Sequence, residues 1–314
     1  VWYQLIAERG YHAGDDTVHF EPLYPLLSHI VSVPLAGHVV PALLIVASSA
    51  FAVAMWLLYK LARIDVGAEA AHLTVLLTVF FPVGFFLLAP YTESLYLALT
   101  LAAFWFARHN RPWLAGLMGL GAALTRTVAI FMVMPLAYAY VKQRDEEGKT
   151  PGLGLLASTF PALGLLGTIG YDRLIVGEHR SVFQVGSQWG DTIVPFWRAV
   201  PDSWSHITAT GDPVEILNLV ALFGFTILAL LAVRRLPLMY SLYTLPYLAL
   251  LFDRESAVSP LESVARYLLV LFPCFMMLAL GLARRRGFAA ACLLVGISMQ
   301  VVLLDYSVHF GFVA

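Results

Sequence analysis

Charged side chains are scarce in this 314-residue sequence. Only 12% of the residues are Asp, Glu, Lys or Arg, about half the share of a typical soluble domain. The net charge is −1, so the sequence has no basic excess with which to bind nucleic acid phosphates, and we expect no nucleic acid partner. Because 60% of the residues are apolar and the mean hydropathy is +0.79, the composition predicts a membrane protein.

Cysteines and several catalytic motifs are also missing. Cys274 and Cys292 are the two cysteines, and both lie in apolar runs, which excludes a disulfide framework and a cysteine metal site. The sequence has no glycine fingerprint for a dinucleotide, so we expect neither a metal nor a cofactor. It also has no Gly-x-Ser-x-Gly or His-Glu-x-x-His motif, which argues against an intramembrane protease.

Long apolar runs dominate what is present. A helix of about 20 apolar residues crosses the hydrocarbon core of a bilayer, and fewer suffice where neighbouring helices bury it. The sequence therefore predicts an all-α, polytopic helical membrane protein of about ten spans. The predicted spans are 38–60, 70–89, 91–107, 112–125, 127–141, 153–175, 213–233, 237–252, 263–283 and 288–306.

Two short motifs predict where helices begin. Residues 212–215 read Asp-Pro-Val-Glu, and residues 259–262 read Ser-Pro-Leu-Glu. Each has a capping residue, a proline at the first helical position and a glutamate at the third, an arrangement that satisfies free backbone amides. We expect a helix to start at each motif.

Positive charges select the orientation of the predicted spans. With ten crossings, 12 of the 19 Lys and Arg residues, including every lysine, fall in one set of loops. The positive-inside rule places that set in the cytoplasm. We therefore expect two regions, an extracytoplasmic juxtamembrane stretch of loops and helices over 1–37 and a multi-span transmembrane domain over 38–314. The domain includes an outer loop at about 176–212, and loops of that length are often functional.

The start of the chain predicts an amphipathic helix. Trp2, Leu5 and Ile6 share one helical face, and Gly10 ends the pattern. An interfacial helix anchored in the membrane surface by Trp2 and Tyr3 would have this sequence.

Four ionisable residues follow within seven positions: Asp15, Asp16, His19 and Glu21. Such a group could supply general acid–base catalysis. It could equally be a solvated loop, and the residues alone do not decide between these interpretations.

Three further charged residues lie at or near predicted spans. Glu93 opens a predicted helix, where a carboxylate is favoured by the helix dipole. Arg266 could pair with Glu262, four residues earlier, on a helix surface. Arg126 and Arg266 could instead be functional, because an isolated charge at membrane depth costs roughly 2.5–3.5 kcal/mol or more.

Several segments, in order along the chain, carry a family resemblance. They share short aromatic, proline and charged motifs and lie on the predicted outer face. Together they resemble the PIG-V-like mannosyltransferases, which belong to the GT-C superfamily of glycosyltransferases. The segments are Trp-Tyr-x-x-Ile-Ala-x-x-Gly-Tyr at 2–11, Phe-x-Pro-Leu-Tyr-Pro at 20–25, Phe-Pro with Pro-Tyr-Thr-Glu-Ser at 81–94, Leu-Thr-Arg-Thr at 124–127, Phe-Gln with Gln-Trp-Gly at 183–190, and Arg-Tyr-Leu-Leu with Phe-Pro at 266–273.

The resemblance implies an activity and a set of residues. It implies a GT-C-like fold and transfer of mannose from a polyprenyl (dolichyl-type) phosphate donor to an extracytoplasmic acceptor. The family's catalytic aspartate belongs to a Trp-Asp pair upstream of the position of Trp2, so we expect the parent protein to carry that pair and one more span before Val1. Within the chain, the candidate catalytic residues are Asp15, Asp16 and Glu21. The candidate substrate-binding residues are Trp2, Tyr3, His19, Tyr91, Glu93, Arg126, Gln188, Trp189, Arg266 and Tyr267.

Two other classes of function remain open on the sequence. One is a multi-span transporter, although the sequence shows no paired broken helices in matching halves. The other is a non-catalytic subunit of an envelope glycan or lipid assembly. In each case we expect an integral membrane protein of a bacterial plasma membrane or an ER-type membrane, with its active face extracytoplasmic. The expected partners are the lipid-linked sugar donor, membrane lipids and a partner membrane subunit.

Overall fold

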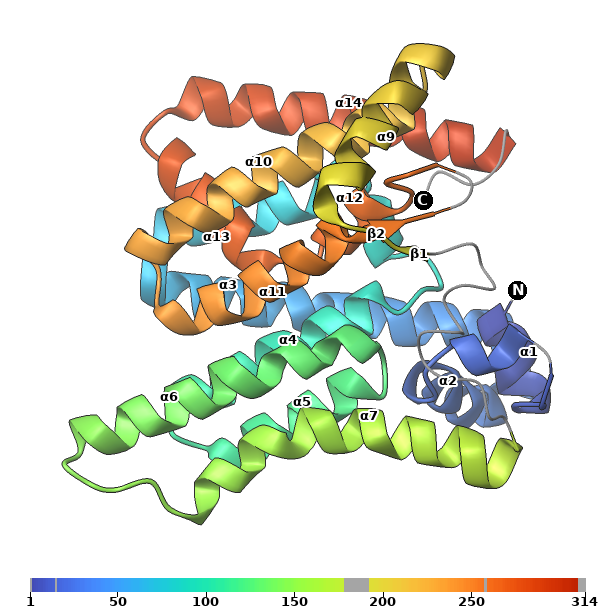
Figure 1. Cartoon of the computed structure of the whole chain (residues 1–314), viewed down its shortest axis with the longest axis vertical. Helices are drawn as coiled ribbons and strands as arrows, with labels where there is room; N and C mark the ends of the chain where they lie inside the picture. The colour runs from blue at the N-terminus through green and yellow to red at the C-terminus, as the bar shows by residue number, and fades with distance from the viewer. Residues whose placement is uncertain (1, 15, 178–191, 257–258, 310–314) are drawn as a thin grey trace. The chain divides into compact units, whose positions relative to one another are not determined.

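The computed structural model describes residues 2–14, 16–177, 192–256 and 259–309, and these residues are almost entirely helical (Figure 1). The predicted all-α class is confirmed. The single exception among the described residues is a two-residue antiparallel pairing of β1 (Thr192–Ile193) with β2 (Arg254–Glu255). The chain forms two compact units, one made of 1–61 and 86–179 and the other of 62–85 and 180–314.

The helices follow one another along both units. The α-helices are α1 (Trp2–Arg9), α2 (Leu23–Ser32), α3 (Val39–Val79), α4 (Glu93–Arg108), α5 (Pro112–Ala123), α6 (Val133–Glu146), α7 (Phe160–Tyr171), α9 (Phe196–Thr210), α10 (Pro213–Arg235), α11 (Leu238–Phe252), α12 (Val264–Leu268), α13 (Phe272–Leu282) and α14 (Arg286–His309). The 3-10 helices are η1 (Asp16–His19), η2 (Val33–Leu35), η3 (Gly84–Leu87), η4 (Thr127–Met132) and η5 (Leu153–Thr159), and η6 (Asp172–Val176) is a π-helix.

Four helical stretches within the described residues are long and apolar enough to cross a membrane: α3, the continuous stretch Leu153–Val176, α10 and α14. They are compatible with an integral membrane protein. Helices also occupy the other predicted segments, but they are shorter. The number of ten crossings therefore stays a prediction.

The first two predicted spans join in α3, which breaks at Gly67. This residue has φ +84° and ψ 169°, a backbone conformation that is essentially restricted to glycine. The break lies between residues 60 and 70, where the sequence predicts a boundary. The predicted span 70–89 is too long, however, because the helix ends at Val79.

The end of α3 is fixed by contacts with α14. Gln300 donates hydrogen bonds from Nε2 to the carbonyl oxygens of Val79 (3.1 Å) and Phe81 (3.3 Å). A Cβ at Gly84 would lie 2.2 Å from the Val79 carbonyl oxygen, so the chain turns back tightly there. Pro82 lies inside this turn, where a helix could not continue without losing a backbone hydrogen bond.

One of the two predicted helix starts is confirmed and the other is wrong. The Asp212 side chain accepts a hydrogen bond from the Val214 amide (2.9 Å) and caps α10. Residues 259–262, in contrast, form turns, and Ser263 adopts a left-handed conformation (φ +65°) before α12 begins at Val264. The predicted span 263–283 is therefore interrupted, because α12 and α13 are separate helices.

In the first unit, α4, α5 and α7 lie side by side, with α6 against them (Figure 1). The predicted N-terminal helix is confirmed as α1, which ends before Gly10 as expected. It packs on α2, and His29 of α2 forms a hydrogen bond with the Ala7 carbonyl oxygen (2.8 Å). Tyr24 of α2 is fully buried and donates to the Leu43 carbonyl oxygen (3.0 Å). These contacts fix the N-terminal segment to the unit.

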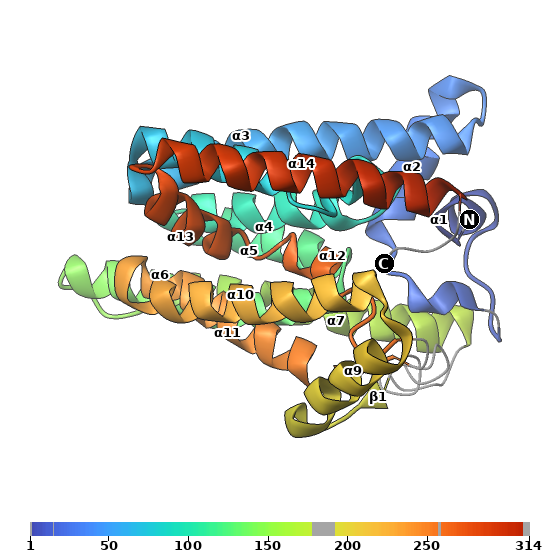
Figure 2. The ribbon, with the colours of Figure 1, turned by 90° about the horizontal axis from the view of Figure 1, so that it is seen from above.

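In the second unit, α10 packs against α11, α12 and α13, and α9 adjoins its N-terminal end (Figure 2). Phe81, Phe225 and Phe275 pack edge to face, with ring centroids 5.1–5.5 Å apart. The Tyr240 hydroxyl of α11 donates to Asp65 (2.6 Å). This frame holds α12, which carries two of the predicted site residues.

Candidate functional site

The turn after α5 places Arg126 beside the start of α4. The Thr125 hydroxyl donates to the Gly121 carbonyl oxygen (2.9 Å), and the Arg126 amide donates to Ala122 (2.9 Å), which closes the end of α5. Arg126 itself is extended (φ −156°, ψ 132°) before η4 begins. A single extended residue between two helices directs its side chain away from both, so Arg126 can reach another segment.

Arg126 and Glu93 form an ion pair in the first unit. Arg126 Nη1 lies 2.9 Å from Glu93 Oε1, and 1% of the Glu93 side chain is exposed against 15% for Arg126. Burying an unpaired carboxylate costs several kcal/mol, so the arginine compensates Glu93. The predicted dipole role of Glu93 agrees with its place in the first turn of α4. Because Glu93 is enclosed and Arg126 is partly exposed, the pair presents the arginine to a ligand.

Glu21 joins the same turn from the N-terminal segment. Its Oε1 accepts a hydrogen bond from the Thr127 amide (3.1 Å), and the Leu23 amide donates to the Leu124 carbonyl oxygen (2.9 Å). Burial raises the pKa of Glu21 to about 7, although the Arg126 charge and the hydrogen bond from Thr127 oppose the shift. A carboxyl group with a pKa near neutrality suits proton transfer at physiological pH.

Aromatic side chains surround these charged groups. The Tyr3 ring packs edge to face on Phe20 (5.0 Å), Tyr24 (5.1 Å) and Tyr91 (6.5 Å, all between ring centroids). Tyr3 also forms a side-chain hydrogen bond with Thr92. Burial, followed by the negative charge of Glu93, raises the pKa of Tyr3. Tyr3 is therefore a neutral hydroxyl throughout the physiological range.

The structure thus gathers part of the predicted set in the first unit. Tyr3, Glu21, Tyr91, Glu93 and Arg126 form one group, which we call the Glu21–Arg126 cluster. Beside it are two more predicted residues, Trp2, which stacks on Phe20 at 6.0 Å, and His19, which ends η1 next to Phe20.

Four predicted residues cannot be placed in this way. Asp15, Gln188 and Trp189 lie outside the described residues. Asp16 begins η1, but its side chain lies outside the described part.

The second unit holds a separate group of two arginines on one tyrosine. The guanidinium carbon of Arg254 lies 4.8 Å from the ring centroid of Tyr267, and that of Arg266 lies 5.2 Å from the same centroid. We call these three residues the Arg–Tyr cluster. Glu262 precedes α12 rather than lying on it, so the predicted helix-surface pairing of Glu262 with Arg266 has no helical frame and is wrong in that form.

Two residues of these groups escaped the sequence analysis. Arg254 lies on β2, whose pairing with β1 joins segments more than 60 residues apart. Thr92 precedes α4 and contacts Tyr3 across about 90 residues. An arginine next to the end of an apolar run was the available signal for Arg254. No local pattern distinguishes Thr92 from other residues before a helix.

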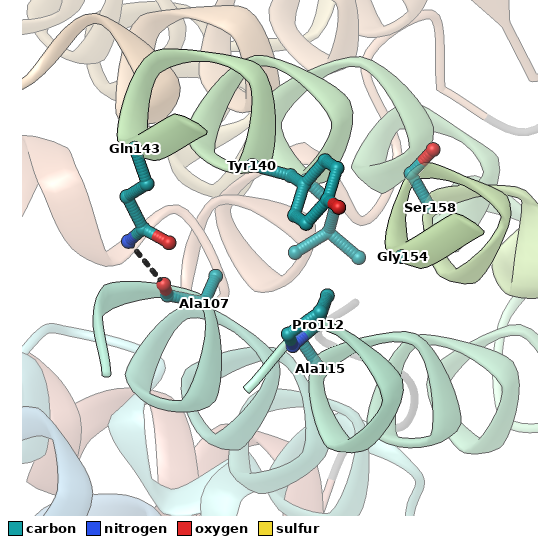
Figure 3. A pocket seen from close by; sticks show the side chains of 8 residues that line it. Ala107, Pro112, Ala115, Tyr140, Gln143, Gly154 and Ser158 are labelled. Carbon is teal, nitrogen blue, oxygen red and sulfur yellow. Dashed lines mark hydrogen bonds between the residues drawn. The ribbon is translucent and has the colours of Figure 1, made fainter. Parts of the chain in front are cut away.

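A small pocket in the first unit lies apart from these clusters (Figure 3). Tyr140 and Gln143 point from α6 toward α4 and α5, and Gln143 Nε2 donates to the Ala107 carbonyl oxygen (2.6 Å). Only about 10 Å³ is available to the centre of a water molecule, which is enough for about one water. The pocket is too small for a sugar and is a packing defect of the helix bundle.

Comparisons with known proteins add no assignment. No family model, curated protein or solved structure matches the chain. Within the described residues, no three His, Cys, Asp or Glu side chains come together as a metal site. The chemistry of the two clusters therefore has to be argued from their own residues.

Proposed function

We propose that the chain is an integral membrane glycosyltransferase of the GT-C type, with about ten spans. It transfers mannose from a polyprenyl (dolichyl-type) phosphate donor to an acceptor on the extracytoplasmic side. The observation that carries the proposal is the Glu21–Arg126 cluster. Its residues come from three separate segments, 2–21, 91–93 and 126–127, and each segment resembles a motif of the PIG-V-like mannosyltransferases.

The cluster contains the groups that sugar transfer needs. A carboxylate takes the proton of the acceptor hydroxyl as that oxygen attacks the anomeric carbon, and the bond from that carbon to the phosphate oxygen breaks. The lipid phosphate leaves with the bonding electrons, and the sugar configuration inverts. An arginine stabilises the departing phosphate through charge-assisted hydrogen bonds. Among the described residues, Glu21 is our candidate base, and Arg126 and Arg266 are our candidates for the phosphate.

The aromatic side chains suit the sugar. Tyr3 and Tyr91 offer apolar ring faces beside the charged groups, and Tyr3 keeps a neutral hydroxyl. A lipid-linked donor also needs no soluble nucleotide-binding domain, which agrees with an all-helical chain. The charge asymmetry of the predicted loops supports an extracytoplasmic site.

The raised pKa of Glu21 gives the first prediction. If Glu21 is the base, it must be ionised, so mannose transfer by the full-length protein should be low at acidic pH and rise through about 7. Glu21→Gln should lose this rise and lower turnover by roughly 10²-fold or more. Glu8→Gln is the matched control, because Glu8 is exposed and contacts Gln4 on α1. Its pH profile should match the wild type.

The stability of the protein provides a check that does not depend on turnover. Because burial raises the pKa of Glu21 above its ordinary value of 4.5, its protonated form is favoured in the folded protein. Its contribution to stability is then full below about 4.5 and is lost as the pH rises through about 7. Glu21→Gln should remove this part of the pH dependence of Tm. If Glu21→Gln keeps normal turnover and an unchanged profile, Glu21 is not the base.

A further inference from the structure

A buried polar row on α10 contacts the segment that carries the Arg–Tyr cluster. Glu215 is fully buried, and Asn218, one helical turn further on, is 2% exposed. Glu215 Oε1 accepts a hydrogen bond from the Leu261 amide (3.1 Å), and its Oε2 accepts one from the Ser259 hydroxyl. Asn218 Oδ1 accepts one from the Ala265 amide (2.9 Å). Two side chains of one helix thus hold both ends of the segment 259–265.

The held segment is irregular. Ser263 has φ +65°, in the left-handed region, which is unfavourable for residues with a side chain. Such conformations persist where the surrounding structure fixes them, and they concentrate at functional sites. Arg266 and Tyr267 follow directly, so the backbone held by Glu215 and Asn218 determines where these two side chains start.

The same segment also positions Arg254. Arg254 Nη1 donates to the Glu262 carbonyl oxygen (3.1 Å), and the Ser256 hydroxyl donates to the Glu262 carboxylate. Segment 259–265 therefore contacts both strands of the Arg–Tyr cluster, the one that supplies Arg254 and the one that supplies Arg266. Moving it would change the spacing of the two guanidinium groups around Tyr267.

We infer that Glu215 and Asn218 are positioning residues, which hold Arg254 and Arg266 at the spacing that binds the phosphate of a lipid-linked ligand. Two guanidinium groups on one ring present a dense array of N–H donors, and arginine is the residue suited to planar recognition of phosphate. The inference rests on the proposed function for the identity of the ligand. The role of a positioning row in α10 rests on the hydrogen bonds alone.

A fully buried carboxylate is an unusual way to hold a loop. Replacing a buried charged group with an apolar side chain of similar volume is often neutral or stabilising. Stability alone therefore does not require Glu215. Its hydrogen-bonding role is instead directional, since two donors 2 residues apart in the chain, Ser259 and Leu261, bind its two oxygens.

The test measures binding, so that it does not depend on sugar transfer. The full-length protein in nanodiscs binds a polyprenyl monophosphate or the matched polyprenol, and the ratio of the two Kd values gives the phosphate preference. We expect the wild type to prefer the phosphate by about tenfold or more, which corresponds to about 1.4 kcal/mol. Arg254→Lys and Arg266→Lys should each reduce the preference several-fold, because lysine cannot form the planar paired contact.

The positioning variants separate geometry from folding. Glu215→Met should stay folded yet lose most of the preference, whereas Glu215→Gln, which keeps an acceptor of the same shape, should retain it. Ser259→Ala offers a milder version of the same loss if Glu215→Met folds poorly. Thr226→Val is the control on α10, because the Thr226 hydroxyl contacts only the Leu222 carbonyl oxygen of its own helix among the hydrogen bonds of the described residues; its preference should not change.

The outcomes decide between the two claims. If folded Glu215→Met and Ser259→Ala keep the wild-type preference, the positioning role is wrong. If the wild type binds polyprenol as tightly as the phosphate, or if dilute inorganic phosphate displaces the lipid, the lipid phosphate site is wrong. If the variants behave as expected but the wild type transfers no mannose, the inference stands and the proposed function fails.

Discussion

The Glu93–Arg126 pair shows how burial changes the value of a charge. An exposed ion pair contributes about 0–1 kcal/mol, and the pair between Lys149 and Glu147 in the same unit is of this kind. Glu93 is enclosed, so its partner compensates a desolvation cost that an exposed glutamate never meets. The two pairs therefore make a controlled comparison within one unit.

Removing the carboxylate from each pair should have very different effects. Glu93→Gln keeps the shape but leaves the Arg126 charge without its buried counter-charge, so the free energy of unfolding should fall by about 3–5 kcal/mol. Glu147→Gln should change it by about 1 kcal/mol or less. Reversible unfolding in mild detergent measures both. Similar small effects for the two variants would mean that the Glu93 carboxylate is solvated, and that Arg126 is held by other contacts.

At this scale the sequence predicted the residues better than their relations. Glu93, Arg126, Tyr3 and Tyr91 were candidates from motifs, and Glu21 was a candidate from a cluster of ionisable groups. Their convergence depends on contacts across 33 and 106 positions, which no local pattern encodes. The partners of Arg266 were misjudged for the same reason, because spacing alone suggested Glu262.

Among the elements, α3 is the one in which a single residue determines the course of the chain. Gly67 has a conformation that other residues adopt at a cost of about 1–3 kcal/mol. A Cβ there would meet no atom within 4 Å, so any cost of substitution would come from the backbone and not from a clash. The break at this position was predicted because the charged stretch before it separates two apolar runs.

Gly67→Ala should therefore lower the free energy of unfolding by about 1–3 kcal/mol. Gly224→Ala is the matched control. Gly224 lies inside α10 and also has open space around it, but alanine is favoured over glycine in a helix by about 0.5–1 kcal/mol. The two substitutions add the same methyl group and should shift Tm in opposite directions. A gain in Tm for Gly67→Ala would show that α3 can straighten without loss.

The misplaced element ends have a common physical origin. Apolar composition continues through residues 80–88, so the pattern predicts a longer helix than the one that Gln300 of α14 terminates at Val79. The Ser-Pro-Leu-Glu motif at 259–262 has the local chemistry of a helix start, but Glu215 of α10 takes the Ser259 hydroxyl and the Leu261 amide. In both places a side chain from a distant helix overrides a local preference.

For the whole molecule, composition alone was enough to predict the class. Few charges and a high mean hydropathy predicted an all-helical membrane protein, and four described helical stretches have the length and composition to cross a bilayer. Shorter helices such as α5 and α13 satisfy the apolar pattern without the length. Their crossing depends on packing against neighbours, which a hydropathy pattern does not contain. The division into two units that interleave along the chain was likewise not predictable from composition.

The central claim is that the sugar donor is a lipid phosphate and not a nucleotide. The most direct measurement offers the purified full-length protein two donors of the same sugar, polyprenyl-phosphate mannose and a mannose nucleotide diphosphate, with a membrane extract as the source of acceptor. We predict mannose transfer and release of polyprenyl phosphate from the first donor, no transfer from the second, and loss of transfer in Glu21→Gln but not in Glu8→Gln. Transfer from the nucleotide donor, or the absence of transfer from the lipid donor by folded protein, would contradict the account.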